Sequence, residues 1–301
     1  MASGTGLFDQ EARAWDTEVL LALDLSPRTL LPVDDSARRG LAAGYRTRWP
    51  ALSGAQWWPA LGDGACALIG TGCGGPRAAL TVGTSAAVRV LVGESERAAR
   101  RPGLFAYLLD PDRVVLGAAR SNAGNLVDWL GRVLRLEGDL VAEVAARPPG
   151  GHGLEAVPDL AGERSPDWPL AASGSVAGLH PDTTALDLAH ALVEAAACGL
   201  ADAIDSLEAA RPGGETLALV GSGRALASPA WRRLVADTSG RAVTPSRVEE
   251  ASARGAAVTA LAGLGWLEPD PGAELDGEPV LPDPARAAEF ARLRATGRGS
   301  R

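Results

Sequence analysis

The spacing of apolar and polar positions differs between regions of the chain and predicts different elements in each. Apolar residues recur at helical spacing over residues 12–23 (ARAWDTEVLLAL), and the sequence SPRTLLP that follows ends the predicted helix. Residues 31–60 are rich in proline and tryptophan, which indicates loops with short strands. We therefore expect one helix followed by irregular structure in this part of the chain.

Two later stretches place β-favouring residues on either side of a short turn. In ALTVGTSAAVRVLV (79–92) the turn is Gly-Thr-Ser, and in FAYLLDPDRVVLGAA (105–119) it is Asp-Pro-Asp. This arrangement is typical of a β-hairpin, so we expect two of them.

Helical periodicity dominates the rest of the chain. We expect helices over residues 123–146, 183–209, 228–237, 249–263 and 284–295, and a strand at 216–220. Thr183 or Thr184 is the expected N-cap of the longest helix. Its buried stripe is expected to comprise Leu186, Val193, Ala196, Leu200, Ile204 and Leu207. Hairpins followed by strands that alternate with helices predict an α/β protein with a mixed sheet, whose glycine-rich strand ends are the usual place for a ligand.

Composition narrows the class of partner. With 301 residues, of which 46% are hydrophobic, the chain can bury a sizeable core as one large or two ordinary domains. Its formal net charge of −8 argues against nucleic acid or an anionic membrane as partner. No run approaches the roughly 20 apolar residues of a membrane span, and the N-terminus lacks a basic start followed by an apolar core. We therefore expect a cytoplasmic protein that acts on small molecules.

The sequence contains no lysine, so arginine supplies all of its fixed positive side-chain charge. A Walker P-loop, a protein-kinase active site and a Schiff-base enzyme each require a lysine. If the protein binds a nucleotide, its phosphates must be held by backbone N–H groups, hydroxyls, a metal ion or arginine.

Cysteine and histidine give little indication of a metal site. Cys66, Cys73 and Cys198 form no C-x-x-C pair, and we expect them to be small buried residues. His152, His180 and His190 lack the i, i+4 spacing of a helical metal pair. A solvated or a core histidine is the better interpretation of each.

One carboxylate stands alone in the run PALGDGACALIG (59–70). Asp63 lies between two glycines, and no other charged residue occurs between Arg48 and Arg77. A surface Asp-Gly turn accounts for this pattern. A half-buried turn that places a general base near a substrate hydroxyl accounts for it as well.

Two glycine turns are candidate ligand contacts. Gly83-Thr84-Ser85 can present backbone N–H and hydroxyl groups to a phosphate, although hairpin geometry alone explains it too. Gly221-Ser222-Gly223 ends a predicted strand and lets the chain pass close to a ligand. The fingerprint G-x-G-x-x-G of a dehydrogenase is absent because position 226 is Leu, which disfavours that class.

Taken together, these stretches resemble the FGGY family of carbohydrate kinases, and most closely its gluconokinase-like members. The matching segments occur in family order: ASGTGLFD (2–9), LPALGDGACALIGTG around Asp63, ALTVGTSAAVRV (79–90), SNAGNLVDWL (121–130), AGERSPDWP (161–169), SGRALASPAWRRLVADTSGRAV (222–243) and EEASARGAAVTALAGLG (249–265).

The resemblance implies the RNase H-like ATPase fold that actin, heat-shock chaperones and hexokinase share, with one complete C-terminal lobe and the end of the N-terminal lobe. It assigns residues 1–72 to the N-terminal, sugar-binding lobe, 73–267 to the C-terminal, nucleotide-binding lobe, and 268–301 to a Pro-rich tail with a short terminal helix. Family members begin with a strand that carries an Asp-x-Gly-Thr phosphate loop, and no such strand precedes Asp63. We therefore expect a truncated chain, a misplaced start or one half of a split gene.

The resemblance also implies roles for single residues. Asp63 matches the catalytic base, with Gly62 beside it at the substrate. The nucleotide-binding set comprises Gly83, Thr84, Ser85, Gly124, Gly221, Ser222, Gly223 and Ser228. The family usually has Gly-Gly where this chain has Ser222-Gly223. ATP and Mg²⁺ are the implied cofactors.

The implied reaction is phosphorylation of D-gluconate to 6-phospho-D-gluconate, with xylulose, glycerol or another polyol as alternative acceptors. Because much of the sugar pocket lies in the missing lobe, we expect little activity from this chain alone. A non-catalytic nucleotide-binding remnant, or one half of a kinase that pairs with a separate N-terminal lobe, is the alternative.

Overall fold

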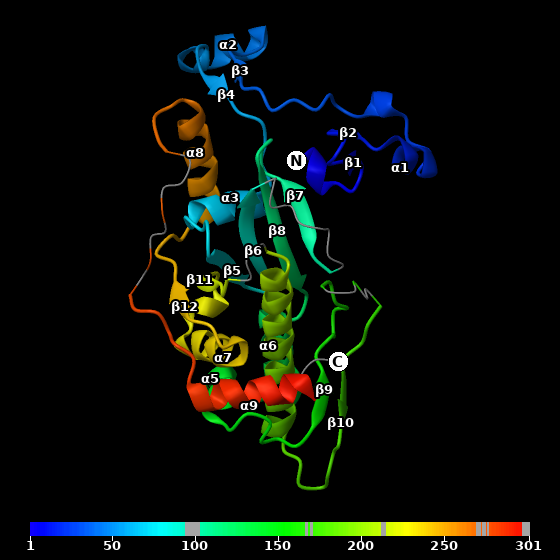
Figure 1. The fold of residues 1–301 in the computed structure, drawn as a ribbon, viewed down its shortest axis with the longest axis vertical. Coiled ribbons are helices and arrows are strands. Elements are labelled where there is room, and N and C mark those ends of the chain that lie inside the picture. Colours follow the sequence, from blue (N-terminus) through cyan, green and yellow to red (C-terminus); the bar gives the residue numbers. More distant parts are fainter. Residues whose placement is uncertain are drawn as a thin grey trace.

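A six-stranded mixed sheet forms the centre of the protein (Figure 1). The computed structural model describes residues 1–93, 103–165, 168, 171–211, 215–268, 272, 275 and 277–296. The strand order is β12-β11-β5-β6-β8-β7. The strands are β5 (Arg77–Val82), β6 (Ala86–Gly93), β7 (Phe105–Leu108), β8 (Arg113–Arg120), β11 (Ala218–Ser222) and β12 (Val243–Pro245).

Both predicted hairpins are present and are neighbours in this sheet. β5 pairs antiparallel with β6, and β7 pairs antiparallel with β8. β11 runs parallel to both β5 and β12. Parallel and antiparallel pairs in one sheet confirm the predicted α/β class.

The long helix α6 (Ala185–Ala209) packs on one face of the sheet. Its N-cap is Thr184, whose side chain accepts the N–H of Asp187 in a capping box. The predicted stripe is buried except for Leu186, which is half-buried against the same core. The other helices on this side are α4 (Gly124–Leu134), α5 (Leu140–Ala146), α7 (Pro229–Ser239) and α9 (Pro284–Ala295).

Two helices, α3 (Asp63–Gly70) and α8 (Ala251–Gly263), cover the opposite face of the sheet. They approach so closely that a Cβ on Gly70 would lie 1.8 Å from the carbonyl oxygen of Ala251. A Cβ on Gly255 would lie equally close, at 1.8 Å, to the carbonyl oxygen of Cys66. Glycine at both positions permits this helix contact.

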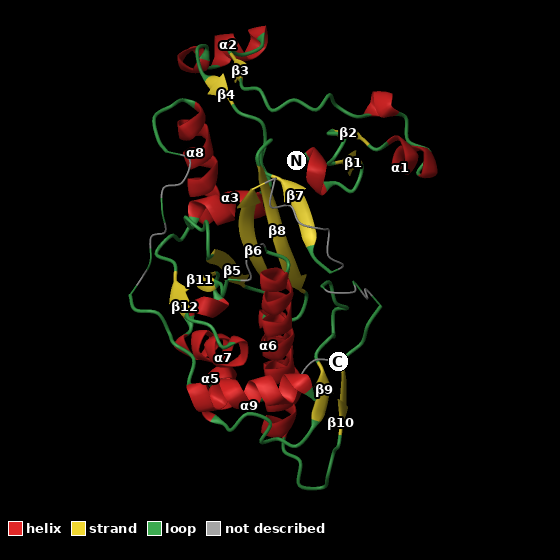
Figure 2. Cartoon of the chain, viewed as in Figure 1, coloured by secondary structure: helices red, strands yellow, loops and turns green. Residues whose placement is uncertain are grey.

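The segment before α3 consists mostly of loops, as Figure 2 shows. Its elements are β1 (Phe8–Asp9), β2 (Ala14–Trp15), α1 (Thr17–Ala22), β3 (Arg38–Arg39), α2 (Ala43–Arg48) and β4 (Gln56–Trp57). The helix predicted over 12–23 is shorter because Asp16 caps it from outside, through its Oδ1 and the N–H groups of Glu18 and Val19. The helix α2 is absent from the prediction for 31–60.

The helix predicted over 123–146 is two helices, α4 and α5. The chain between them takes positive φ at Arg135 (52°) and at Gly138 (85°), which a continuous helix does not allow. An antiparallel pair of strands, β9 (Glu155–Val157) and β10 (Ser175–Ala177), follows α5. Part of the predicted tail, and residues 166, 167, 169 and 170 after the AGER sequence, lie outside the described residues.

Among the described helices, none combines the length and the apolarity that crossing a membrane requires. The proposed boundaries at residues 72 and 267 stay predictions. Because α3 packs on α8, residues assigned to different lobes share one core.

Candidate active site

Asp63 is the first residue of α3 and its side chain is exposed. Its Oδ1 accepts the N–H of Gly64 at 2.8 Å, and its carbonyl oxygen accepts the hydroxyl of Ser252, at the start of α8, at 3.2 Å. The predicted half-buried turn is therefore wrong: the residue begins a helix whose free N–H groups favour a carboxylate. Gly62 is the N-cap.

A hollow of about 930 Å³ lies in front of Asp63. The N-terminal segment, the start of α3 and the strands β6 and β7 form its walls. Asp63, Gly64, Arg89, Tyr107 and Trp168 are among the residues that line it. The hollow is large enough for a small polyhydroxy molecule.

Arg89 and Tyr107 lie against the start of α3. A Cβ on Gly64 would be 2.8 Å from Arg89 Nε and 3.0 Å from the Tyr107 hydroxyl, so glycine leaves the room that these side chains use. Burial raises the pKa of Tyr107, and the positive charge of Arg89 opposes that rise. Sequence reasoning missed both residues. The available signal was Arg89 as the single charge within the run 78–93.

The turn Gly83-Thr84-Ser85 is held against the start of α4. Gly124 N–H donates to the carbonyl oxygen of Gly83 at 3.0 Å, and Asn125 N–H donates to that of Thr84 at 3.1 Å. A Cβ on Gly124 would lie 2.4 Å from Gly83 O, so glycine is needed there. Next to Gly83 there is open space, since a Cβ would meet nothing within 4 Å.

The end of β11 lies beside this turn. Ser222 Oγ is 3.1 Å from Thr81 Oγ1, and Gly223, at φ 90°, lies so close to β5 that a Cβ would be 2.5 Å from Val82 O. Ser228 Oγ, farther along, is buried and has no hydrogen-bond partner among the residues that the structure describes. The structure thus brings Gly83–Ser85, Gly124 and Gly221–Gly223 to one edge of the sheet.

A short segment after β12 connects this edge to Asp63. Ser246 N–H donates to the carbonyl oxygen of Gly221 at 2.8 Å. Ser252, six residues on, donates to Asp63. The start of α3 and the glycine-rich end of β11 are therefore held by the same segment.

The AGER sequence positions the approach to α4. Glu163 is buried, accepts the N–H of Ser121 at 2.6 Å and pairs with Arg120 Nε at 3.2 Å. Asn122 Nδ2 donates to the carbonyl oxygen of Gly162 at 2.9 Å. These bonds fix the chain immediately before Gly124.

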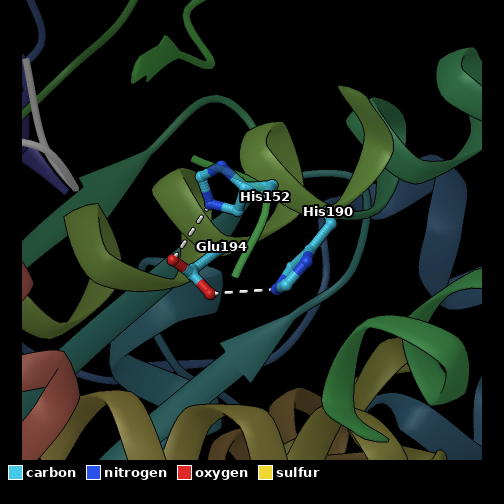
Figure 3. Close-up of side chains that lie close together, drawn as sticks. All are labelled: His152, His190 and Glu194. Carbon is cyan, nitrogen blue, oxygen red and sulfur yellow. Dashed lines mark hydrogen bonds and ion pairs between the residues drawn. The ribbon is translucent and has the colours of Figure 1, made fainter. Parts of the chain in front are cut away.

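His152 and His190 flank Glu194, although they are far apart in the sequence (Figure 3). The Nε2 atoms of His152 and His190 lie 3.3 and 3.1 Å from the Glu194 carboxylate oxygens. Burial alone would raise the pKa of Glu194, but hydrogen bonds from both histidines and from Gly150 N–H lower it to about 2. The three side chains are near enough to share a metal ion.

The hydrogen bonds of His152 argue against that use. Its Nδ1 accepts the N–H of Leu154 at 3.0 Å, so the proton of the neutral ring is on Nε2, the atom that faces Glu194. A metal would need the lone pair of that Nε2. We therefore describe the cluster as a hydrogen-bonded core. His180 is exposed and the three cysteines are buried free thiols, as predicted.

Comparisons with known proteins are consistent with this geometry. The family described as "FGGY family of carbohydrate kinases, C-terminal domain" matches residues 78–264. The glycerol kinase of Citrifermentans bemidjiense is 36% identical over 281 residues, which are 89% of this chain and 54% of that protein. The xylulose kinase of Streptomyces rubiginosus is 33% identical over 276 residues, 87% of this chain and 52% of that protein. The chain thus spans about half the length of these relatives.

Solved kinase structures superpose on most of this chain. The gluconate kinase of Lactobacillus acidophilus superposes with a TM-score of 0.86 at 25% identity, covering 98% of this chain and 62% of that one. The Plasmodium falciparum glycerol kinase with ADP shares the fold, with a TM-score of 0.74 at 19% identity, over 97% of this chain and 61% of that one. The expected C-terminal ATPase lobe is confirmed.

Proposed function

The chain belongs to the FGGY family of carbohydrate kinases, and from this premise we propose that it phosphorylates a hydroxyl of a sugar or sugar acid with ATP, with Asp63 as the general base. The observation that carries the proposal is the position of Asp63. Its exposed carboxylate lines the hollow, while its main chain is tied through Ser252 to the segment that holds Gly221. A carboxylate so placed can take the proton of an acceptor hydroxyl as that hydroxyl attacks a phosphate.

The glycine-rich edge of the sheet is the proposed nucleotide site. The open turn Gly83-Thr84-Ser85 would face the phosphates, and Gly221, Ser222 and Gly223 would lie along the adenosine. The unpartnered Ser228 Oγ fits a polar ligand because a buried hydroxyl without a partner is unfavourable. Gly124 contributes by having no side chain, which lets α4 approach the turn. Bound Mg²⁺, held through the phosphates, would neutralise charge on the transferred group.

The acceptor that we propose is D-gluconate. The sequence segments resemble gluconokinase-like members of the family, and a gluconate kinase is among the matching structures. Glycerol and xylulose, which relatives are named for, are the alternative acceptors.

Acceptor-dependent ADP release tests the proposal. We expect a low rate from this chain alone, because much of the sugar pocket is expected outside it, and we expect Asp63→Asn to lower that rate about 10²- to 10⁴-fold, because general-base catalysis contributes that much. ADP binding, measured by calorimetry, should be unchanged. Asp112→Asn, which neutralises an exposed carboxylate outside the hollow, is the matched control. A full rate in Asp63→Asn would exclude Asp63 as the base.

A further inference from the structure

We propose that Arg89 binds the carboxylate of an acidic acceptor in the hollow beside Asp63, and that it makes the site selective for sugar acids over neutral polyols. The inference rests on the proposed function, since it assigns the acceptor to this hollow. It adds a binding residue and a chemical class of substrate to it.

The position of Arg89 within β6 is unusual for a charged residue. β6 lies inside the sheet, between β5 and β8. Val88 and Val90 point into the core beneath α6, so Arg89 projects from the opposite face, where α3 and α8 pack. Apolar residues of the same face, among them Ala79 and Val115, form the core under α3 and α8. A guanidinium at this point of the sheet requires a partner.

Within the part of the chain that the structure describes, Arg89 has no carboxylate partner within 4 Å, and its buried Nε makes no hydrogen bond. The ring of Phe105 lies 5.9 Å from its Cζ, which supports the charge weakly. A buried donor without an acceptor is unfavourable by an amount comparable to a lost hydrogen bond. A ligand carboxylate, which can accept two N–H bonds from one guanidinium, would satisfy it.

Asp63 and Arg89 line the same hollow without pairing with each other. Gly64, the residue after Asp63, is the one whose missing Cβ leaves room for Arg89 Nε. A sugar acid carries a carboxylate at one end and hydroxyls along its chain. Such a molecule can present a hydroxyl to Asp63 and its carboxylate to Arg89.

Two of the other carboxylates of the hollow are engaged by the main chain, while Glu11, which also lines it, is exposed. Asp9 Oδ1 accepts the N–H groups of Glu11 and Ala12, and Asp16 Oδ1 accepts those of Glu18 and Val19. Asp9 and Asp16 therefore have local partners, whereas Arg89, among the described residues, interacts with the Tyr107 hydroxyl but pairs with no carboxylate. In a chain with a net charge of −8, a positive group inside the hollow is what an anionic acceptor needs.

A phosphate group is the alternative anion that Arg89 would bind in place of the acceptor carboxylate. The turn at Gly83–Ser85 is the proposed phosphate contact, and Arg89 lies about 10 Å along the strand from Ala86, where that turn ends. This separation from the proposed phosphate contact favours a role for Arg89 in binding the acceptor. The test nevertheless includes inorganic phosphate.

The experiment follows the Nε–H NMR signal of Arg89 in the full chain, assigned by its absence from Arg89→Lys. It is titrated at matched ionic strength with D-gluconate, with D-glucitol, which replaces the carboxylate by a neutral alcohol, and with inorganic phosphate. We expect a saturable shift with gluconate at a concentration about 10- to 100-fold lower than with glucitol or phosphate, because a charge-assisted pair adds that much.

Calorimetry on variants gives a second measurement. Arg89→Gln should bring gluconate and glucitol to within twofold of each other, and Arg77→Gln, which removes an exposed arginine outside the hollow, should keep the difference. An equal response of the wild type to gluconate and glucitol, a stronger response to phosphate, or no response to any of the three would overturn the inference.

These outcomes are separable from a failure of the proposed function. If phosphoryl transfer fails, no acceptor releases ADP, while the Arg89 signal still responds to gluconate. If the inference fails, ADP release from glucitol and gluconate is equal, and Arg89→Gln leaves that ratio unchanged.

Discussion

Charged side chains on the two faces of the sheet differ in whether they pair with other residues of the chain. On the side of α6, Glu194 is surrounded by His152, His190 and the N–H of Gly150, and Asp237 pairs with Arg286 at 2.8 Å. On the side of α3, Arg89 Nε has no hydrogen-bond partner among the described residues, and Asp63 is exposed. His190 Nδ1 and Ser228 Oγ on the α6 side also make no hydrogen bond within the described part of the chain, so the contrast concerns the charged groups: the carboxylates there are paired, whereas the guanidinium Nε of Arg89 at the hollow is not.

The difference separates the expected effects of mutations. Substitutions on the α6 side should change the free energy of unfolding, because the partners of each charge belong to the chain. Substitutions of Arg89 and Asp63 should change binding and turnover with little change in stability. Stability measurements on matched pairs of variants test this division.

Gly255→Ala should destabilise the α3–α8 layer by about 3 kcal/mol or more, because its Cβ would lie 1.8 Å from the carbonyl oxygen of Cys66. Urea unfolding followed by circular dichroism measures the change. Gly131→Ala is the control, since a Cβ there meets nothing within 4 Å, and we expect it to stabilise α4 slightly. Equal stability of the two variants would contradict the close contact between α3 and α8.

Glu194→Gln should lower the free energy of unfolding by about 2 kcal/mol at neutral pH, because the amide replaces an acceptor that serves His152, His190 and Gly150. Glu137→Gln, which changes an exposed carboxylate in the same way, should stay within about 0.5 kcal/mol of the wild type. A stability loss no larger than that of the control would show that the cluster contributes nothing to the α6 side.

The same residue predicts a dependence on pH. The pKa of Glu194 is lowered in the folded state from 4.5 to about 2. Its contribution is therefore complete above pH 4.5 and is lost as the pH falls toward 2, by about 3 kcal/mol in all. Unfolding curves between pH 6 and pH 3 should show about 2 kcal/mol of this loss in the wild type and not in Glu194→Gln.

The sequence predicted those elements whose signals are local. The hairpins at 79–92 and 105–119 follow from alternation around a turn, and α6 follows from its periodicity and the cap at Thr184. α3 escaped prediction because its eight residues are held by glycine contacts with α8, nearly 200 positions later. The break at Arg135 escaped because the apolar pattern continues across it.

The site residues fall into the same two groups: those with a local sequence pattern and those defined by contacts between distant positions. Asp63 and the glycine turns were found because each is a local pattern, and the structure then showed Asp63 exposed on a helix. His152 is 42 positions from Glu194, so no spacing rule joins them. Arg89 became a candidate only from its surroundings in the structure, where no described carboxylate pairs with it, and a sequence does not show such an environment.

Thr184→Ala should destabilise α6 by about 1 kcal/mol, because the capping box with Asp187 is lost. Ser206→Ala is a matched control on the same helix, since this exposed hydroxyl donates only to the carbonyl oxygen of Asp202 among the described residues. We expect the control to be neutral within about 0.5 kcal/mol. Thermal unfolding distinguishes the two, and equal midpoints would show that the cap does not contribute.

Arg89→Met should leave the stability unchanged or raise it by up to about 1 kcal/mol, because an apolar side chain of similar length needs no hydrogen-bond partner. Arg241→Met is the matched comparison: its guanidinium Nε donates to Glu208 Oε1 at 2.6 Å and also pairs with Asp205, so its loss should be clearly destabilising. Urea unfolding of both variants measures the contrast. If Arg89→Met were as destabilising as Arg241→Met, Arg89 would be satisfied within the fold, and the difference between the two faces of the sheet would no longer indicate where a ligand binds.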